Sequence, residues 1–490
     1  MSRRSDLDRF GEANGQVANS ATAGAAAANS STTGATTSAV APASGGLTGR
    51  LRRFDPRLLD RRSGKRVLDF VSTAGFTVAI VGVHLVQGIL LARLLGPDGR
   101  GSYAAAMLYV QLLTYVGLMG GLDVICRAAA SRTSRASSGS DDAVSDESLW
   151  PLRRSAFRLG ATTGVITAVV AIVLSVVAIP ADKRDVIPWA ILSATSLIGL
   201  HITLVYTGVD RGVENLTAYN IRRFIAAVAF PVLVIVAACF GTVTVPVACG
   251  AFVAGSVISV AACLIDRNGL QIRKMFGRSD TPVPRLLGQS GPYGLSMLAT
   301  ELFERLDLLL VLWLAPIVQQ GYYAAMVPAV YPLTVIPNTL GVFLFNRGTD
   351  AGRRLTVSEL HRVMAASIGV QAVVTITFML LIGWVVRLFY GEAFGPAVVY
   401  ALWLAPASAI RGILQGLDAY LKGRGRPMVS VTTRITAMVV TLVTTAILFP
   451  VHGVVSIAMA TLLGQVVCLI GLTAILYVDC YRGDQSEHVL

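Results

Sequence analysis

Twelve segments of this chain are long and apolar enough to cross a lipid bilayer. A helix that crosses the hydrocarbon layer needs about 20 mostly apolar residues. Only 14% of the residues are charged, against about 25% in soluble proteins. The sequence therefore predicts an all-α integral membrane protein with about 12 transmembrane helices. The expected spans are residues 70–92, 102–122, 157–180, 187–208, 222–241, 244–264, 290–315, 321–345, 363–387, 396–418, 428–449 and 453–478.

The distribution of basic residues predicts the orientation of these spans. With the N-terminus in the cytoplasm, 32 of the 41 lysines and arginines fall on the cytoplasmic side and five on the opposite side. Because cytoplasmic loops are enriched in Lys and Arg, we expect both termini in the cytoplasm. The net charge of +13 therefore reflects membrane topology, and nucleic acid is not expected as a partner. The loops on the opposite side are short, so no sizeable domain is expected there.

The segment before the first span has a different composition. Residues 15–48 are almost wholly Ala, Ser, Thr, Gly and Asn. Such a segment buries too little apolar surface to offset its ordering entropy. We therefore expect residues 1–66 to form a disordered cytoplasmic tail. Its last part, residues 50–66, carries eight basic residues, which serve either as a topology signal or as contacts to anionic membrane lipids.

The chain contains an internal repeat. The sequence GSYAAA from residue 101 matches GYYAAM from residue 321, an offset of 220. Further along, GVD from residue 208 matches GLD from residue 416, an offset of 208. The loop after span two is longer than the loop after span eight, and this length difference reconciles the two offsets.

The repeat predicts how the chain is divided. We expect two six-helix halves, residues 67–264 and 290–479, joined by a cytoplasmic linker at 265–289 and followed by a short tail at 480–490. Both halves start on the same side of the membrane, so they form a parallel repeat about an axis along the membrane normal. In transporters built this way, the substrate cavity opens at that axis.

One predicted span carries charges near its middle. The span at 290–315 contains Glu301, Glu304, Arg305 and Asp307. Each charge at a helix centre costs roughly 2.5–3.5 kcal/mol in the membrane. The four fall within one arc of about 160°, so we expect them to face protein or water. Glu301 and Arg305 can form an internal pair that only fixes packing; the alternative is that this face lines a substrate cavity, since intramembrane ionisable groups are usually functional.

Other polar residues are expected near the same axis. The offset of 220 places His84 at the position of Glu304 and Gln87 at that of Asp307. His84 is either a cavity residue or a hydrogen-bonded core histidine. Arg411 is a further deeply placed cation. Two arginines in one cavity would suit a diphosphate, because a guanidinium binds phosphate oxygens bidentately and stays charged. The nearby acids and His84 would neutralise the arginines or carry a coupling proton.

Charged residues also lie at the expected cytoplasmic ends of three spans. We interpret them either as interfacial pairs and anchors or as a gate at the cytoplasmic mouth of the cavity. They are Asp123 and Arg127 after span two, Asp210 and Arg211 after span four, and Asp418 after span ten.

The chain lacks the motifs of an enzyme. It has no nucleophile motif, no Walker loop and no cluster with metal-ligand spacing. None of its six cysteines lies in a CxxC or Cys/His pattern, so disulfides are not expected. The sequence predicts a protein that is not an enzyme, has no cofactor or metal, and is not driven directly by ATP.

Several short segments resemble one family of membrane proteins. The sequence ARLLGPDGRG at residues 92–101 is similar to the first external loop of polysaccharide flippases of the Wzx kind, which share a superfamily with MATE drug exporters and the lipid II flippase. The resemblance covers about residues 67–478. The other similar segments are Arg305-Leu-Asp307 followed by GYYAA from residue 321, LFYGEAF at 388–394, and KGRGRP at 422–427.

The resemblance implies a multi-pass protein of the bacterial cytoplasmic membrane that moves an undecaprenyl-diphosphate-linked oligosaccharide to the outer leaflet by alternating access. It implies a cationic central cavity, to which Arg305 and Asp307 are expected to contribute, and H⁺ or Na⁺ as a coupling ion. Polysaccharide polymerases or glycosyltransferases would be its partners. The lipid II branch has fourteen spans, so the expected twelve argue against that branch.

Two other functions compete with this interpretation. A MATE-like, ion-coupled exporter of small amphipathic molecules would need an apolar, aromatic site with one or two acids and no deep arginines. An enzyme that polymerises or ligates lipid-linked glycans would need a sizeable external loop with catalytic groups, and no such loop is predicted.

Overall fold

The computed structural model describes residues 61–137, 146–266, 269–275, 277, 279, 282–288, 291–335, 337, 356–424 and 427–487. The chain divides into a short unit, residues 1–74, and a large compact unit, residues 75–490. The large unit contains nearly all of both halves of the repeat. Residues 1–60 of the predicted tail lie outside the described residues, and α2 begins at Arg61, inside that predicted tail.

The first half of the repeat consists of long helices that match the predicted apolar spans. Its apolar segments form continuous helices because a backbone in lipid must satisfy its hydrogen bonds within the segment. Asn215 caps α7 by accepting a hydrogen bond from the Ala218 amide at 3.2 Å. The elements are α2 (Arg61–Val116), α3 (Gly121–Ser137), α4 (Asp146–Ala178), η2 (Ala181–Val186), α5 (Ile187–Ala194), α6 (Ser196–Gly212), α7 (Leu216–Phe240) and α8 (Val245–Leu264).

Two features at the ends of predicted span two differ from the sequence expectation. The external loop expected before it is only a sharp kink inside α2, where Gly96 adopts φ 66°. Glycine tolerates this conformation and Pro97 suits the first turn of the helix that follows. The span also ends early, at Val116, because Met119 (φ 48°) and Gly120 (φ 79°) both leave the helical region. The chain then starts a new helix, α3.

The linker between the halves is short and locally ordered. Strands β1 (Ile265–Asp266) and β2 (Gly269–Leu270) pair antiparallel. Two short helices, α9 (Ile272–Met275) and α10 (Val283–Gly288), follow. These elements lie within the linker predicted at 265–289.

The second half repeats the helical pattern of the first. Pro328 and Pro332 remove backbone donors, and α12 gives way to the 3₁₀ turn η3 between them. The predicted span 321–345 continues beyond the described residues. The elements are α11 (Gly291–Leu314), α12 (Ile317–Val330), η3 (Tyr331–Thr334), α14 (Val357–Val385), η4 (Val386–Tyr390), η5 (Glu392–Ala397), α15 (Val398–Gly423), α16 (Pro427–His452) and α17 (Val455–Glu487).

The outward faces of these helices are apolar. Phe240 is 88% exposed and Leu380 is 80% exposed, which is expected of side chains that face lipid. Within the described residues, nine helices are long and apolar enough to cross a membrane. The predicted fold class, a nearly all-helical multi-pass membrane protein, is confirmed. The predicted number of twelve spans stays a prediction, because part of the chain lies outside the described residues.

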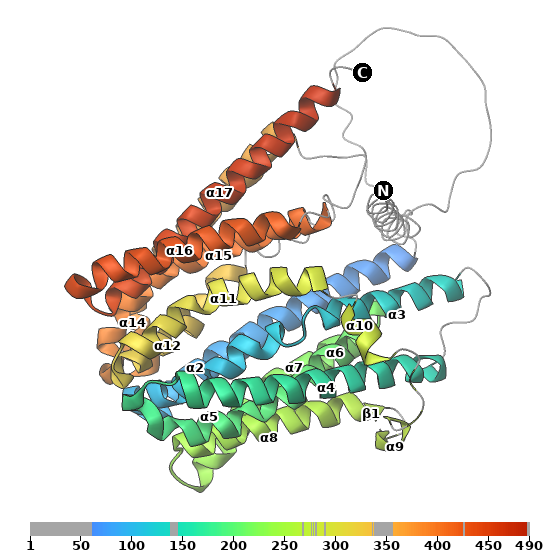
Figure 1. Cartoon of the computed structure of the whole chain (residues 1–490), viewed down its shortest axis with the longest axis horizontal. Helices are drawn as coiled ribbons and strands as arrows, with labels where there is room; N and C mark the ends of the chain where they lie inside the picture. The colour runs from blue at the N-terminus through green and yellow to red at the C-terminus, as the bar shows by residue number, and fades with distance from the viewer. Residues whose placement is uncertain are drawn as a thin grey trace, which may run out of the picture. The chain divides into compact units, whose positions relative to one another are not determined.

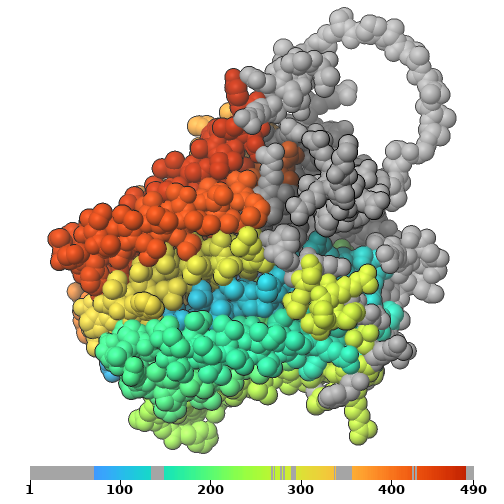
Figure 2. All heavy atoms as spheres, in the orientation of Figure 1, coloured from blue at the N-terminus to red at the C-terminus, as the bar shows by residue number. Residues whose placement is uncertain are grey.

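The largest apolar clusters each belong mainly to one half. In the first half, α4 packs on α6, and α7 on α8; in the second, α16 and α17 lie side by side (Figure 1). One buried cluster joins α2 with α4 to α8 and includes Leu312 of α11, and another joins α11, α12, α14, α15 and α17 and includes Ala92 of α2. Figure 2 shows part of α2, in blue, between the yellow of α11 and α12 and the green of α4. Helix α2 is therefore a central element between the two halves.

The halves meet backbone to backbone at two glycines. A Cβ atom built on Gly101 would overlap the carbonyl oxygen of Ile317, and one built on Gly321 would overlap the carbonyl oxygen of Pro97. Each Cβ would also lie 3.0 Å from the amide nitrogen of the other glycine. Residues 97 and 317 have the same offset of 220 as the glycines, so the contact obeys the repeat. We call this end of the helices, formed by residues 93–101, 183, 312–321 and 388–389, the closed end.

Cations of the first half donate to backbone carbonyls of the second half at the closed end. The ammonium of Lys183 donates to the carbonyl oxygens of Leu312 and Ala315 (2.6 Å to the latter). Arg93 Nε donates to the Phe389 carbonyl oxygen at 2.6 Å, and its Nη2 to that of Leu388. Hydrogen bonds with a charged donor are the strong class, so these contacts stabilise the closed end.

Candidate functional site

A cavity of about 480 Å³ lies between the two halves, next to the closed end. Its walls come from α2 and α8 of the first half and from α11, α12, η3 and α15 of the second. On the part of α2 before the kink at Gly96 the lining runs from His84 to Leu91, and on the part after it from Arg100 to Tyr115, a rise of about 22 Å. The charged residues of the lining are Arg100, Glu301, Glu304, Arg305 and Arg411.

The residues predicted on the charged face of α11 lie in this cavity, with one exception. Glu301, Glu304 and Arg305 line it. Asp307 is not a lining residue: it is 4% exposed and accepts hydrogen bonds from the Tyr323 hydroxyl at 2.9 Å and the Leu308 amide at 2.8 Å. Its carboxylate therefore joins α11 to α12 within the second half.

Arg305 bridges the halves across the middle of the cavity. Its Nη1 donates to Gln111 Oε1 of α2 at 3.0 Å. Its Nε lies 4.0 Å from Glu301 Oε2, one helical turn away. The side chain keeps 27% of its surface exposed, so the guanidinium is held from both sides and still accessible to a ligand.

Arg411 enters the cavity from α15. Its Nη2 donates to the backbone carbonyl of Glu304 at 3.4 Å, and its buried Nε has no hydrogen-bond partner among the described residues. One turn further on, Gln415 Nε2 donates to Glu304 Oε1 at 3.3 Å. The Glu304 carboxylate therefore pairs with an amide, and Arg411 keeps free donor capacity.

The two polar residues predicted in the first half also line the cavity. His84 Nδ1 and Gln87 Oε1 are 3.4 Å apart on α2, and both side chains face the cavity. His84 is exposed there, unlike a satisfied core histidine. The structure thus brings His84 and Gln87 together with Glu301, Glu304, Arg305 and Arg411 around one cavity.

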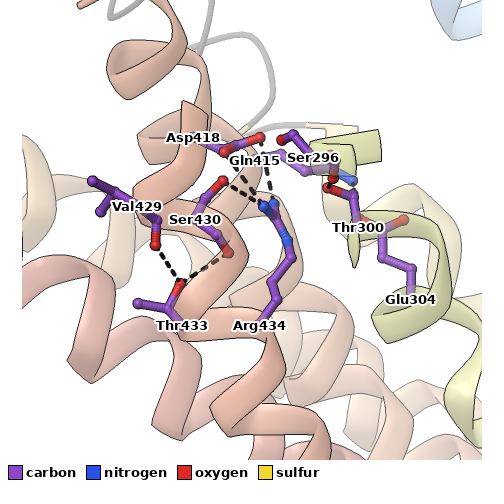
Figure 3. A network of polar contacts seen from close by, with 9 residues as sticks. All are labelled: Ser296, Thr300, Glu304, Gln415, Asp418, Val429, Ser430, Thr433 and Arg434. Carbon is purple, nitrogen blue, oxygen red and sulfur yellow. Dashed lines mark hydrogen bonds and ion pairs between the residues drawn. The ribbon is translucent and has the colours of Figure 1, made fainter. Parts of the chain in front are cut away.

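Two of the acids predicted at the cytoplasmic mouth, Asp210 and Asp418, form ion pairs inside their own half. Asp210 is fully buried, is hydrogen-bonded by Arg222 Nη1, and lies 3.9 Å from Arg153 Nη2. Asp418 Oδ2 lies 3.4 Å from Arg434 Nη2, and Arg434 also reaches the Ser430 hydroxyl at 2.7 Å, as Figure 3 shows.

The two buried ion pairs are related by the offset of 208 between Asp210 and Asp418. Each joins the fourth helix of its half to the fifth, so each holds one half together. The remaining predicted residues of this group, Asp123, Arg127 and Arg211, are exposed on α3 and α6.

Sequence reasoning missed several lining residues. Arg100, Gln111, Gln320 and Tyr331 were not selected. The repeat carried the missing signal, because Arg100 corresponds to Gln320 and Gln111 to Tyr331 at the offset of 220. Polar or aromatic side chains occupy both members of each pair. Such matched pairs indicate residues that face the axis between the halves more clearly than a single residue does.

Within the described residues, no group of three or more His, Cys, Asp or Glu side chains is arranged to hold a metal ion, and the cysteines form no disulfide. What the cavity offers is a set of guanidinium, carboxylate, amide and imidazole groups at the interface of two halves. Such a set can bind and release an anion.

Solved structures share this fold. The lipid II flippase MurJ in an inward closed conformation superposes with a TM-score of 0.63 at 10% identity, over 83% of this chain and 86% of MurJ. An inward-facing multidrug resistance MATE transporter of the MOP superfamily gives 0.59 at 16% identity, over 84% and 99%. The eukaryotic MATE transporter AtDTX14 gives 0.58 at 13% identity, over 86% and 99%. The chain has the fold of these MOP superfamily transporters.

Sequence comparisons identify the family. No curated protein matches the chain. The family model described as polysaccharide biosynthesis protein matches residues 69–346, which is more than half of the 490 residues. This match confirms the resemblance found in the sequence motifs and covers α2, α11 and α12, whose side chains form most of the cavity. The chain is therefore a member of the polysaccharide biosynthesis protein family.

Proposed function

We propose that this protein moves an undecaprenyl-diphosphate-linked oligosaccharide from the cytoplasmic to the outer leaflet of the bacterial cytoplasmic membrane by alternating access. The pair of arginines beside one cavity, Arg305 and Arg411, carries the proposal. A guanidinium stays charged in the membrane and binds two phosphate oxygens at once. The diphosphate would lie at these arginines while the lipid tail remains in the bilayer.

The charges of the cavity favour transient binding of an anion. Three arginines and two glutamates line it, which gives a net positive charge with His84 neutral. Glu301 lies within 4.0 Å of Arg305, so it would neutralise that arginine when the cavity is empty. An arriving diphosphate would compete with Glu301, and this competition would keep binding reversible, as transport requires.

Glu301 and Glu304 are the candidates to carry a coupling ion, H⁺ or Na⁺, since intramembrane carboxylates commonly serve this role. The excess of basic residues on one side supports cytoplasmic termini. Polysaccharide polymerases or glycosyltransferases would use or supply the lipid-linked glycan. Asp307 would act as a positioning residue for α11.

The test is transport in proteoliposomes loaded with a fluorescent lipid-linked oligosaccharide. We expect Arg305→Ala and Arg411→Ala each to slow flipping by at least about tenfold, because each removes one bidentate phosphate contact. Arg387→Ala is the matched control: this arginine is exposed and lies outside the cavity. Transport that is equally fast in both cavity variants and the control would refute the proposal.

A second function is favoured by one observation. Tyr115 and Tyr331 line the same cavity as Glu301 and Glu304, and a site with acids and aromatic rings suits an amphipathic cation. The alternative is therefore an ion-coupled exporter of such molecules. Binding of ethidium that survives Arg305→Ala but is lost in a Glu301→Gln, Glu304→Gln double variant would support export. Binding of farnesyl diphosphate that depends on Arg305 would support the flippase.

A further inference from the structure

We propose that Arg100 is a second binding site for the diphosphate group, at the closed end of the cavity, and that its occupation loosens that end. The identity of the anion rests on the proposed function. The position and surroundings of Arg100 are independent of it.

Arg100 is a buried cation that faces the cavity without an acidic partner. It lines the cavity and is 8% exposed. Its Nη2 donates to the Ala324 carbonyl at 3.0 Å, and its guanidinium lies 5.6 Å from the centre of the Tyr103 ring. Among the described residues, its buried Nε has no hydrogen-bond partner and its guanidinium forms no ion pair within 4.0 Å.

This environment favours an anionic ligand. A buried charge is costly unless it is paired and hydrogen-bonded. Arginine has five N–H donors, and in the part of the chain that the structure describes one acceptor, the Ala324 carbonyl, is hydrogen-bonded to them. A phosphate group would supply both the missing charge and the missing acceptors, because the planar guanidinium can bind two phosphate oxygens side by side.

Arg100 and Arg305 are well separated along the cavity. Arg305 is bound to Gln111, which lies eleven residues after Arg100 on the uninterrupted part of α2 that follows the kink at Gly96. This corresponds to a rise of about 16 Å, or roughly half of the hydrocarbon thickness. An anion that passes from Arg305 to Arg100 would therefore cover about half of the bilayer before the closed end has to open.

Occupation of Arg100 would weaken the contact between the halves. Its bond to Ala324 joins α2 of the first half to α12 of the second. A phosphate oxygen and the carbonyl oxygen of Ala324 are both negative and would compete for the same guanidinium. When the anion wins, the closed end keeps its contacts from Lys183 and Arg93 but loses this one. Arrival of the anionic head would thus favour opening of the end through which it leaves.

The experiment measures the distance between spin labels on Asp98→Cys and Glu392→Cys by double electron–electron resonance. Both positions are exposed and lie in different halves near the closed end. The full-length protein is purified with the exposed Cys239 replaced by serine. Farnesyl diphosphate and inorganic pyrophosphate are the probes, and farnesol is the control without charge. We expect farnesyl diphosphate to increase the population with longer distances, and farnesol to leave it unchanged.

Three variants separate an anion site from a mere structural contact. Arg100→Gln is expected to abolish the ligand-dependent lengthening, and Arg100→Lys to retain part of it because the charge remains. Lys183→Gln is the matched control, because it removes a closed-end cation that does not line the cavity. In this variant the distances should be longer already without ligand, and farnesyl diphosphate should lengthen them further. A full response in Arg100→Gln would overturn the proposal. The proposal would also be overturned if Arg100→Gln gave long distances without ligand and Arg100→Lys gave the same distances, because the charge at position 100 would then have no effect.

Failure of this inference can be told apart from failure of the proposed function. If farnesyl diphosphate binds in a manner that depends on Arg305, but the response does not depend on Arg100, only the second site is refuted. If no diphosphate binds at all, the proposed function fails with it. A response to pyrophosphate without one to farnesyl diphosphate would assign Arg100 to a soluble anion and contradict its role in lipid transport.

Discussion

Gly101 and Gly321 occupy equivalent places in the two halves and pack against each other so closely that neither position has room for a Cβ atom. The clashing groups are the carbonyls of Ile317 and Pro97, which belong to the backbone and cannot rotate away. The closeness of the two halves at the closed end therefore depends on the absence of two side chains.

Gly101→Ala should hold the closed end apart. Overpacking of this kind costs about 1–3 kcal/mol, which shifts the ratio of closed to open molecules about 5- to 150-fold. Spin labels at Asp98→Cys and Glu392→Cys should report longer distances, and transport should fall. Gly82→Ala is the control, because nothing lies within 4 Å of a Cβ at that position. Unchanged distances in Gly101→Ala would show that the backbones adjust.

Asp210→Ala should destabilise the first half rather than alter gating. Asp210 is fully buried and pairs with Arg222. Removing one partner of a buried ion pair leaves an uncompensated charge and costs about 3–5 kcal/mol. The melting temperature of the purified protein should fall by several degrees, while Asp123→Ala, an exposed acid on α3, should leave it unchanged. A normal melting temperature with lost transport would instead support a gate.

Hydropathy and charge predicted the helices well but not the burial of the charges. The break between α7 and α8 lies within residues 241–244, as the apolar pattern indicates. The expected spans leave Lys183 and Arg100 in loops opposite the cytoplasm, yet the two side chains are only 2% and 8% exposed. A charge count shows on which side of the membrane a residue lies. It cannot show that the two halves close over it, because that depends on packing between segments far apart in the sequence.

The sequence also did not predict which residues contact the charged side chains of α11. Glu301, Arg305 and Asp307 share one face of the helix. Even so, Asp307 binds Tyr323 in its own half and Arg305 binds Gln111 in the other. Helical periodicity predicts a common face about 160° wide, and residues at opposite edges of so wide a face contact different neighbours. Which neighbour each residue meets is decided by the way α2 and α12 flank α11.

Gln111→Ala should weaken diphosphate binding without abolishing it. The Gln111 side chain holds Arg305 from the first half at 3.0 Å, and a typical hydrogen bond contributes about 0.5–1.5 kcal/mol. The dissociation constant of farnesyl diphosphate, measured by calorimetry, should rise about 2- to 10-fold, whereas Arg305→Ala should abolish binding. Gln319→Ala is the control, since that glutamine does not line the cavity. Binding equal to that of the control would exclude a positioning role for Gln111.

Glu301→Gln should separate binding from coupling. The Glu301 carboxylate competes with any anion for Arg305, 4.0 Å away. Its neutral amide replacement should leave Arg305 free and tighten farnesyl diphosphate binding, by up to about tenfold for a change of 1.4 kcal/mol. If Glu301 also carries the coupling ion, transport driven by an ion gradient should fall despite tighter binding. If it only balances Arg305, transport should still respond to the gradient. Weaker binding in Glu301→Gln would contradict the competition between the carboxylate and the diphosphate, and would place the anion away from Arg305.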